Sequence, residues 1–227
     1  MHKTTFAVIA AAAITAGTGV AQAAPKNYCA DLKGAQAGTT CTVSGSDPAY
    51  TLTITFPTDY YDTKSIAEYV GKTRDSFVNA AKGTPNGQPH TLTITSAVYQ
   101  SQVPPRGSRS VVLTTYENLD AAHPRISYRG FTWDQAYRKP ITWETLWQPS
   151  ADPLPVLAPY VQAELAKQAA QPVTIAADAA YDPANYQQFA ITNDGVIFFF
   201  SQGTLLPEAA GATQVLVPRS VIDPMLA

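Results

Sequence analysis

Histidine is the residue on which most zinc sites and many hydrolytic sites depend, and this chain holds three, His2, His90 and His123. No H-x-x-x-H or H-E-x-x-H motif is present, so the sequence predicts neither a metal site nor a cofactor. A Ser-His-Asp triad built on His123 stays open, although a loop histidine is the simpler interpretation and no G-x-S-x-G motif occurs. Ser108 lies in a Gly-Ser-Arg sequence that a hairpin turn explains. We therefore expect a binding protein rather than an enzyme, with a serine esterase as the alternative.

A group of basic residues in the middle of the chain is the clearest candidate for a binding surface. Its members are Arg106, Arg109, Arg125, Arg129, Arg138 and Lys139. They fall on turns and strands of a predicted meander, so several could share one face that meets an acidic protein or an anionic headgroup. The alternative is a set of scattered, solvated charges. Our predicted binding residues are Arg106, Arg109, Arg125 and Arg129.

Carboxylates and tryptophans gather in the same region, and this composition is shared by sugar-binding sites. The residues are Asp134, Glu144 and Asp152 with Trp133, Trp143 and Trp147. Packing in the core is the alternative for the tryptophans.

Over the whole chain 15 basic and 17 acidic residues give a net charge of −2. Because there is no basic excess to hold phosphates, nucleic acid is not an expected partner.

The first residues of the chain have the pattern of a secretory signal peptide. Lys3 precedes an apolar, alanine-rich stretch over residues 6–16, and Ala21-Gln22-Ala23 is a small-x-small cleavage motif. The sequence predicts a signal peptide over residues 1–23, cut between Ala23 and Ala24. The stretch is too short to span a bilayer, and no later segment is long and apolar enough to do so. We expect a secreted, extracellular protein without a membrane span.

The chain has only two cysteines, Cys29 and Cys41. In the oxidising environment outside the cell, two lone cysteines most simply pair with each other. A metal or redox pair is the alternative, but the spacing is too wide for a C-x-x-C motif and no histidine lies nearby. The sequence therefore predicts a disulfide near the start of the exported chain.

The elements of the first half predict a sheet with one helix on it. Residues 50–56 alternate apolar and polar side chains, and the segment Thr-Leu-Thr-Ile-Thr within them recurs at residues 91–95. We interpret the two segments as strands of one sheet rather than as a repeat. A helix capped by Asp62 or Ser65 lies between them and ends at Gly83. Residues 91–133 predict an antiparallel meander.

The second half predicts a helix and a hairpin. Residues 152–168 carry apolar side chains at helical spacing, and Asn193-Asp194-Gly195 is a turn between strands at 189–192 and 196–200. The strand at 196–200 is apolar at every position, so we expect both of its faces to be covered. The predicted fold class is α+β, a mostly antiparallel sheet with packed helices.

Seven stretches along the chain are long and idiosyncratic: residues 24–29, 46–50, 103–107, 133–142, 192–200, 206–211 and 217–220. They resemble the family of secreted mycobacterial immunogenic proteins used as diagnostic antigens. The resemblance implies an exported α+β protein with a β-grasp-like sheet and a Cys29–Cys41 bridge. It also implies an antigen and interaction protein that works on host or envelope partners. The family offers no catalytic residues to carry over.

The C-terminal half, from about residue 125 to 227, also resembles a wider bacterial extracytoplasmic module. The pattern of that module falls on residues 139–146, 154–168 and 193–200. In one branch of exported anti-sigma factors the module binds lysozyme, which makes a lysozyme-binding or inhibitor-like protein a second alternative. Residues 203–209 replace the aromatic pair usual in the loop of the module. We expect residues 24–227 to form one α+β domain that includes this module.

Overall fold

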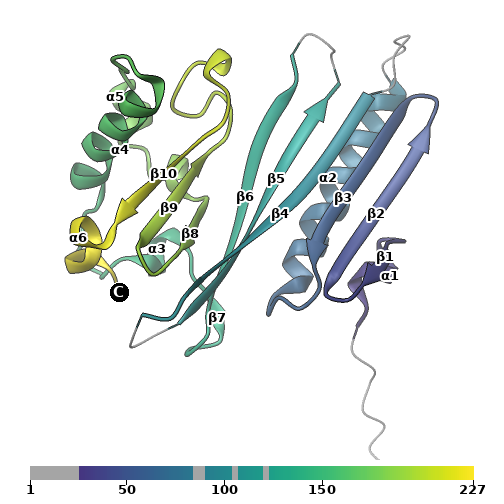
Figure 1. Cartoon of the computed structure of the whole chain (residues 1–227), viewed down its shortest axis with the longest axis horizontal. Coiled ribbons are helices and arrows are strands. Elements are labelled where there is room, and N and C mark those ends of the chain that lie inside the picture. The colour runs from purple at the N-terminus through teal and green to yellow at the C-terminus, as the bar shows by residue number, and fades with distance from the viewer. Residues whose placement is uncertain (1–25, 84–89, 104–106, 120–122) are drawn as a thin grey trace, which may run out of the picture.

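A computed structural model describes residues 26–83, 90–103, 107–119 and 123–227. The predicted signal peptide, its cleavage site at Ala23 and Ala24, and Arg106 lie outside these residues. The fold is α+β with mostly antiparallel sheets, as the sequence predicts. A larger sheet forms one side of the molecule in Figure 1, and a smaller sheet with most of the short helices forms the other.

The larger sheet has seven strands that lie in chain order. They are β1 (Ala35–Ala37), β2 (Thr40–Asp47), β3 (Tyr50–Pro57), β4 (His90–Ser101), β5 (Ser108–Asn118), β6 (Arg125–Asp134) and β7 (Lys139–Pro140). Neighbours are antiparallel except β3 and β4, which run parallel because the helix α2 (Thr63–Gly83) connects them. The two Thr-Leu-Thr-Ile-Thr segments pair here, Thr51 with Thr91 through Ile54 with Ile94. The predicted pairing in one sheet and the predicted meander are both confirmed.

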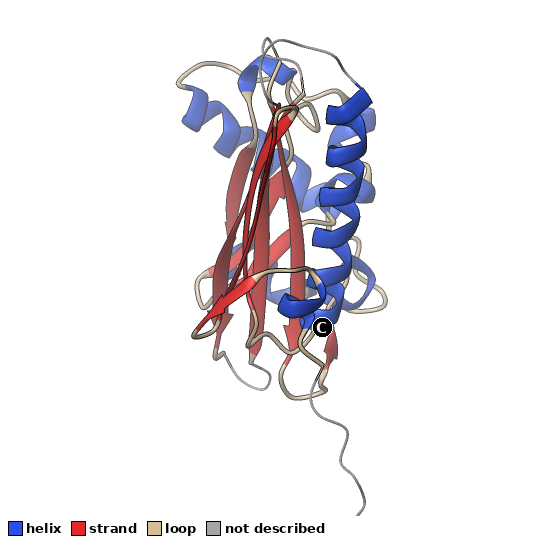
Figure 2. Cartoon of the chain, turned by 90° about the vertical axis from the view of Figure 1, so that its right-hand side faces the viewer, coloured by secondary structure: helices blue, strands red, loops and turns tan. Residues whose placement is uncertain are grey.

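Helix α2 covers one face of the larger sheet, which Figure 2 shows nearly edge-on. The Asp62 side chain caps the helix, since its Oδ1 accepts the Ser65 backbone N–H at 3.2 Å. The buried stripe of the helix includes Ile66, Val70 and Phe77, which share a core with the inward side chains of β2 to β5. The helix forms because its apolar residues recur at helical spacing opposite an apolar sheet face.

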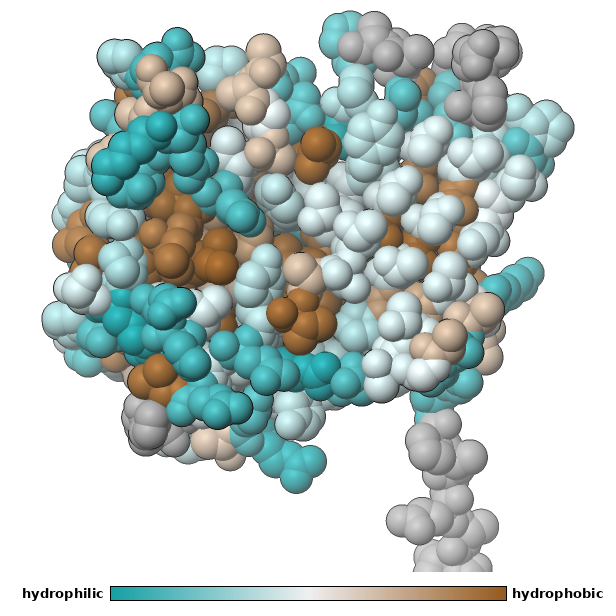
Figure 3. All heavy atoms as spheres, viewed as in Figure 1, coloured by the Kyte–Doolittle hydropathy of each residue, from teal (hydrophilic) through white to brown (hydrophobic). Residues whose placement is uncertain are grey.

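The other face of β2, β3 and β4 is lined by threonine and serine, for example Ser44, Thr53 and Thr95, all exposed. These hydroxyl side chains form the broad pale area on the right of Figure 3. Alternation along a strand sends every second residue to this face, so the repeated threonines follow directly from the sequence.

The smaller sheet has three antiparallel strands in the order β10, β9, β8. They are β8 (Phe189–Ile191), β9 (Gly195–Phe200) and β10 (Thr213–Pro218), and α4 (Leu154–Ala169) packs on them. The remaining helices are short: α1 (Tyr28–Asp31), α3 (Trp143–Leu146), α5 (Ala177–Ala180), α6 (Arg219–Ile222), η1 (Pro183–Tyr186), η2 (Glu208–Ala210) and η3 (Asp223–Met225).

Strand β9 lies between two layers, as its continuous apolar sequence predicts. Phe198 and Phe200 point into a core that they share with Leu157 of α4. Phe199 points the other way and packs against Val112 of β5 in the larger sheet. All three phenylalanines are buried. The smaller sheet therefore lies on the face of the larger sheet opposite α2, and α4 closes its outer side.

Side chains from the C-terminal half also cover the outer edge of β6. Three backbone N–H groups of that edge donate to side-chain oxygens at 2.9–3.0 Å: Ile126 to Gln202, Tyr128 to Ser201 and Gly130 to Gln188. An open edge strand offers unpaired donors to a strand from another chain. Because these donors are taken, this edge does not recruit a partner by strand addition.

The disulfide forms between Cys29 of α1 and Cys41 of β2, with their Cα atoms 5.6 Å apart. Both residues are buried. A Cβ at Gly34 would stand 2.6 Å from the Cys41 sulfur and 2.8 Å from the Cys29 sulfur, so only glycine fits against the bond. The predicted pairing is confirmed.

Candidate functional site

Arg109 is not free for a partner, because it is held by the loop between β3 and α2. Its Nη2 lies 2.8 Å from Oδ2 of Asp59, and its Nη1 donates to the Asp59 carbonyl oxygen at 2.9 Å. The Arg109 side chain is 16% exposed, and its Nε is buried without a hydrogen-bond partner. Arg109 thus anchors the start of β5 to the loop before α2.

Arg125 and Arg129 both lie on β6, where alternation places them on the face that α2 covers. Arg125 stands opposite Glu117 in the ladder with β5. The guanidinium of Arg129 lies 5.9 Å from the ring centre of Tyr69 and 5.5 Å from that of Phe131. Among the described residues no carboxylate or hydrogen-bond acceptor pairs with it. Arg129 is exposed, and the contacts of its guanidinium are with these two rings.

A cavity of about 240 Å³ opens beside Arg129. We call it the Arg129 pocket and define it by Tyr60, Asp62, Arg129, Phe131, Trp133 and Gln187. The loop before α2 supplies its first two residues, and β6 supplies the next three. The pocket exists because β6 continues past the N-terminus of α2, where the helix no longer covers the strand.

Two further donors in the Arg129 pocket have no acceptor in the described part of the chain. The Trp133 Nε1 is buried and unpaired. The Tyr60 hydroxyl has no hydrogen-bond partner among the described residues, but it is not one of the buried unpaired atoms, although the residue as a whole is 5% exposed. Burial, and then the Asp62 carboxylate, raise the pKa of Tyr60 well above its usual value, while Arg109 acts in the opposite direction. The Tyr60 hydroxyl therefore stays protonated and remains a donor.

Only one of the three tryptophans belongs to this pocket. Trp143 and Trp147 lie in the core under the smaller sheet, where their ring centres are 5.3 Å apart. Trp133 is stacked against Tyr61 at 6.1 Å, and Tyr61 is 57% exposed. Core packing, the alternative to sugar contact, is confirmed for Trp143 and Trp147.

His90 and His123 lie far from Ser108. His90 begins β4 and His123 precedes β6, so both are at the end of the sheet where β5 finishes. Ser108 begins the 11-residue β5 at the opposite end, about 33 Å away at the usual rise per residue. A triad of Ser108 with His123 is excluded. Ser108 is also a buried strand residue, so its interpretation as a turn residue was wrong.

A second cavity, of about 320 Å³, lies between the two sheets at this far end. Its lining includes one residue from each of the adjacent strands β4, β5, β6 and β7, and each stands opposite the next in the ladder: Ser101, Ser108, Asp134 and Lys139. The Ser108 hydroxyl is buried without a partner, whereas Asp134 Oδ1 accepts the backbone N–H groups of Ala136 and Tyr137. We call this the serine pocket. Sequence reasoning missed it because only the register brings these residues together.

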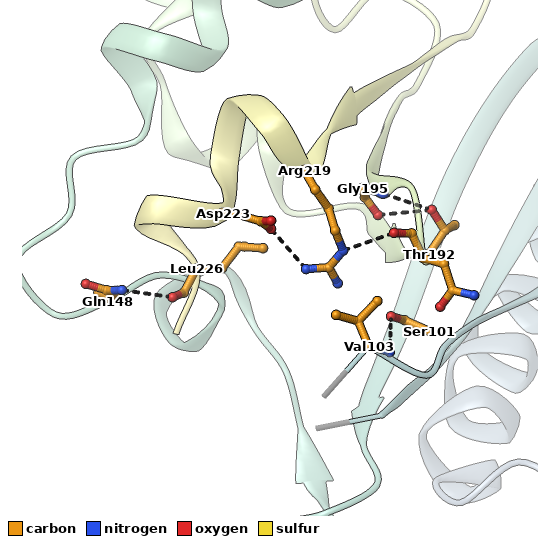
Figure 4. A network of polar contacts seen from close by, with 9 residues as sticks. Ser101, Val103, Gln148, Thr192, Gly195, Arg219, Asp223 and Leu226 are labelled. Atoms are coloured by element: carbon orange, nitrogen blue, oxygen red, sulfur yellow. Dashed lines mark hydrogen bonds and ion pairs between the residues drawn. The ribbon is translucent and has the colours of Figure 1, made fainter. Parts of the chain in front are cut away.

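Arg219 closes the serine pocket from the smaller sheet. Figure 4 shows its guanidinium pointing toward Asp223 and toward the turn between β8 and β9, above Ser101 and Val103. Its Nη1 lies 3.0 Å from Asp223 Oδ1, and its Nε donates to the Asn193 carbonyl oxygen at 3.0 Å. These contacts hold Arg219 in place at the junction of the two sheets.

The described residues contain no group of three or more His, Cys, Asp and Glu side chains placed to hold a metal ion. Among the helices within the same ranges, none has the length and hydropathy needed to cross a bilayer.

Comparison with known proteins gives close relatives. The chain is 56% identical over 223 residues to Immunogenic protein MPB64 of Mycobacterium bovis, covering 98% of each chain. It is 45% identical over 199 residues to Esterase Rv3036c of Mycobacterium tuberculosis, covering 87% of this chain and 88% of that one. Residues 144–220 match the family described as "Protein of unknown function (DUF3298)", within the C-terminal module that the sequence resemblance marks off.

A solved structure shares the fold. A DUF3298 family member from Bacteroides fragilis superposes with a TM-score of 0.54 at 12% identity, covering 83% of this chain and 93% of that one.

Proposed function

The chain belongs to the family of the mycobacterial Immunogenic protein MPB64, and from that premise we propose that it is an exported, non-enzymatic binding protein. It acts outside the cell on a host or envelope protein and is recognised there as an antigen. The observation that carries the proposal is Arg129, an exposed residue whose guanidinium lies over two aromatic rings and has no counter-charge among the described residues. A cation stacked in this way is oriented for a partner rather than used by the fold.

Export is part of the proposal. The buried Cys29–Cys41 bond suits an oxidising compartment, and the relative named as an immunogenic protein supports release from the cell. The signal peptide over residues 1–23 would be removed between Ala23 and Ala24. Mass spectrometry of protein recovered from culture medium tests this, because a chain that retains residues 1–23 would contradict it.

Affinity capture tests the binding function. Oxidised protein, exported from its expression host, is immobilised and exposed to host-cell and envelope extracts, and each recovered protein is purified for a titration. The proposal expects one partner with a saturable isotherm that is absent for the chain unfolded in urea. Lysozyme is included as a purified ligand, because the module resemblance implies it. If no recovered protein binds saturably, the binding function fails.

Ester hydrolysis is the second candidate, since a relative at 45% identity is named an esterase and the buried Ser108 hydroxyl is unpaired at a pocket. Ser108 would be the nucleophile, and Asp134 is its titratable neighbour across the ladder. The test is turnover of short p-nitrophenyl esters by homogeneous protein. This candidate expects measurable turnover, and Ser108→Ala should abolish it. Ser101→Ala, at the cross-strand neighbour of Ser108, should leave the turnover intact, and so should His123→Ala. Equal, low rates for all the variants would remove it.

A further inference from the structure

The Arg129 pocket holds more hydrogen-bond donors than the described part of the chain can satisfy. The Arg129 guanidinium lies over the rings of Tyr69 and Phe131, and its N–H groups have no acceptor among the described residues. The Tyr60 hydroxyl, on a residue that is 5% exposed, also has no acceptor. Arg129 is exposed, and of the three donors the Trp133 Nε1 is the one that is buried without a partner. Buried polar groups in folded proteins nearly always have a partner, so the unmet Trp133 N–H at this cavity points to a ligand that accepts.

We propose that the Arg129 pocket binds a carboxylate group of the partner protein. Arg129 donates to the carboxylate oxygens, Tyr60 donates its hydroxyl, and the Trp133 indole N–H is the third donor. The inference rests on the proposed binding function and names the chemistry that this function recognises.

The charges around the pocket favour a carboxylate over a phosphate. Arg129 supplies one positive charge, and Tyr60 and Trp133 are neutral donors. Asp62 also lines the pocket, and its carboxylate is engaged as the cap of α2 through the Ser65 N–H. A second negative charge on the ligand would face Asp62 without a second cation to offset it. A planar monoanion matches one guanidinium, which binds carboxylates through two parallel hydrogen bonds.

The size of the pocket sets what can carry the carboxylate. A volume of about 240 Å³ lies below the range usual for drug-sized ligands and suits one side chain or one chain terminus. Phe131, Trp133 and Pro140 give it apolar walls beside Arg129, which is itself exposed. An acidic side chain and a C-terminal carboxylate both fit this description, and they share the chemistry that the donors recognise.

Calorimetric titration of the oxidised full protein with short peptides tests the inference. One peptide carries an internal Glu between blocked termini, a second carries a free C-terminus and no acidic side chain, and the same sequence with Gln and blocked termini is the blank. Inorganic phosphate is the fourth probe. We expect one of the first two to bind saturably. Arg129→Gln should weaken that peptide at least about tenfold, and Tyr60→Phe about fivefold, as expected for a charged and a neutral hydrogen bond.

Arg125→Gln is the matched control, because it removes the same charge four residues away on the same face of β6. It should leave peptide affinity within twofold of the unsubstituted protein. Binding of the Glu peptide assigns the site to acidic side chains, and binding of the free-terminus peptide alone assigns it to chain termini. The inference is overturned if phosphate binds more tightly than both, if neither peptide binds, or if Arg125→Gln weakens binding as much as Arg129→Gln. If a captured partner binds Arg129→Gln as tightly as the unsubstituted protein, the proposed binding function is retained but carboxylate binding at the Arg129 pocket is not part of it.

Discussion

Gly130 of β6 lies against the backbone of Phe189 in β8, so the two sheets meet at main-chain distance. A Cβ at Gly130 would stand 3.0 Å from the Phe189 carbonyl oxygen and 3.1 Å from its backbone nitrogen. Thr132, two residues along β6, donates its hydroxyl to the same carbonyl at 3.0 Å. The C-terminal module is therefore fixed onto the larger sheet by backbone contact as well as by apolar packing.

Gly130→Ala should destabilise the protein, because a methyl group at this contact forces the two sheets apart. Overpacking of this kind costs about 1–3 kcal/mol of unfolding free energy. Urea denaturation measures it, with Gly83→Ala as the control, since nothing lies within 4 Å of a Cβ there. Equal stability of the Gly130 variant and the unsubstituted protein would contradict the close packing.

Phe199→Ala should also destabilise the protein, because it removes apolar packing between the same two sheets. The Phe199 ring lies 5.8 Å from the ring of Tyr99 and 5.3 Å from that of Tyr128, and the residue is 2% exposed. Removing a buried phenylalanine ring costs about 3–5 kcal/mol. Phe199→Leu, which keeps most of the volume, should lose less than half as much. If both variants unfold at the same urea concentration as the parent, the ring does not join the sheets.

The disulfide should contribute about 3 kcal/mol, the value expected for closing a loop of this length. The double variant Cys29→Ser with Cys41→Ser, compared with the oxidised parent in urea, measures the contribution. Adding reductant should lower the stability of the parent toward that of the variant and leave the variant unchanged. A reductant effect on the variant would mean that the loss has another source.

Alkaline pH should destabilise the fold through Tyr60 and Tyr186. Burial is the main cause that raises the pKa of both side chains. The pKa of Tyr186 rises to about 12, with a smaller contribution from Tyr181. In the unfolded chain both ionise near pH 10.0. Because the folded values are the higher ones, this stabilisation is complete below pH 10 and is lost as the pH rises toward 12. Tyr60→Phe should reduce the loss of stability over that interval in urea titrations, and an unchanged slope would contradict it.

The sequence predicts the elements of this fold better than its sites, and particular residues show why. The alternation of Thr-Leu-Thr-Ile-Thr and the unbroken apolar run of β9 are local patterns that determine which faces are buried, and both were interpreted correctly. Register is not local. Ser108 and Asp134 meet because two strands pair at one offset, and no pattern within either strand records that offset.

Arginine roles are hidden in sequence for a related reason. Arg109 and Arg129 look alike along the chain, but the fold brings Asp59 to the first and two aromatic rings to the second. Asp59 and Tyr69 lie on other elements, and only Phe131 is a near neighbour in sequence, two residues from Arg129 on β6. The signal that could have been used is the aromatic pattern of β6, where Phe131 and Trp133 share the face of Arg129.

The indole N–H resonance of Trp133 gives the most direct test of carboxylate binding at the Arg129 pocket. In ¹⁵N-labelled protein, Trp133→Phe assigns the signal, and the buried Trp143 and Trp147 serve as internal references. Titration with the blocked Glu peptide should move the Trp133 signal saturably, leave the other two in place, and have no effect on it in Arg129→Gln. A Trp133 signal that stays fixed while the peptide binds, or that moves equally in Arg129→Gln, would contradict the account.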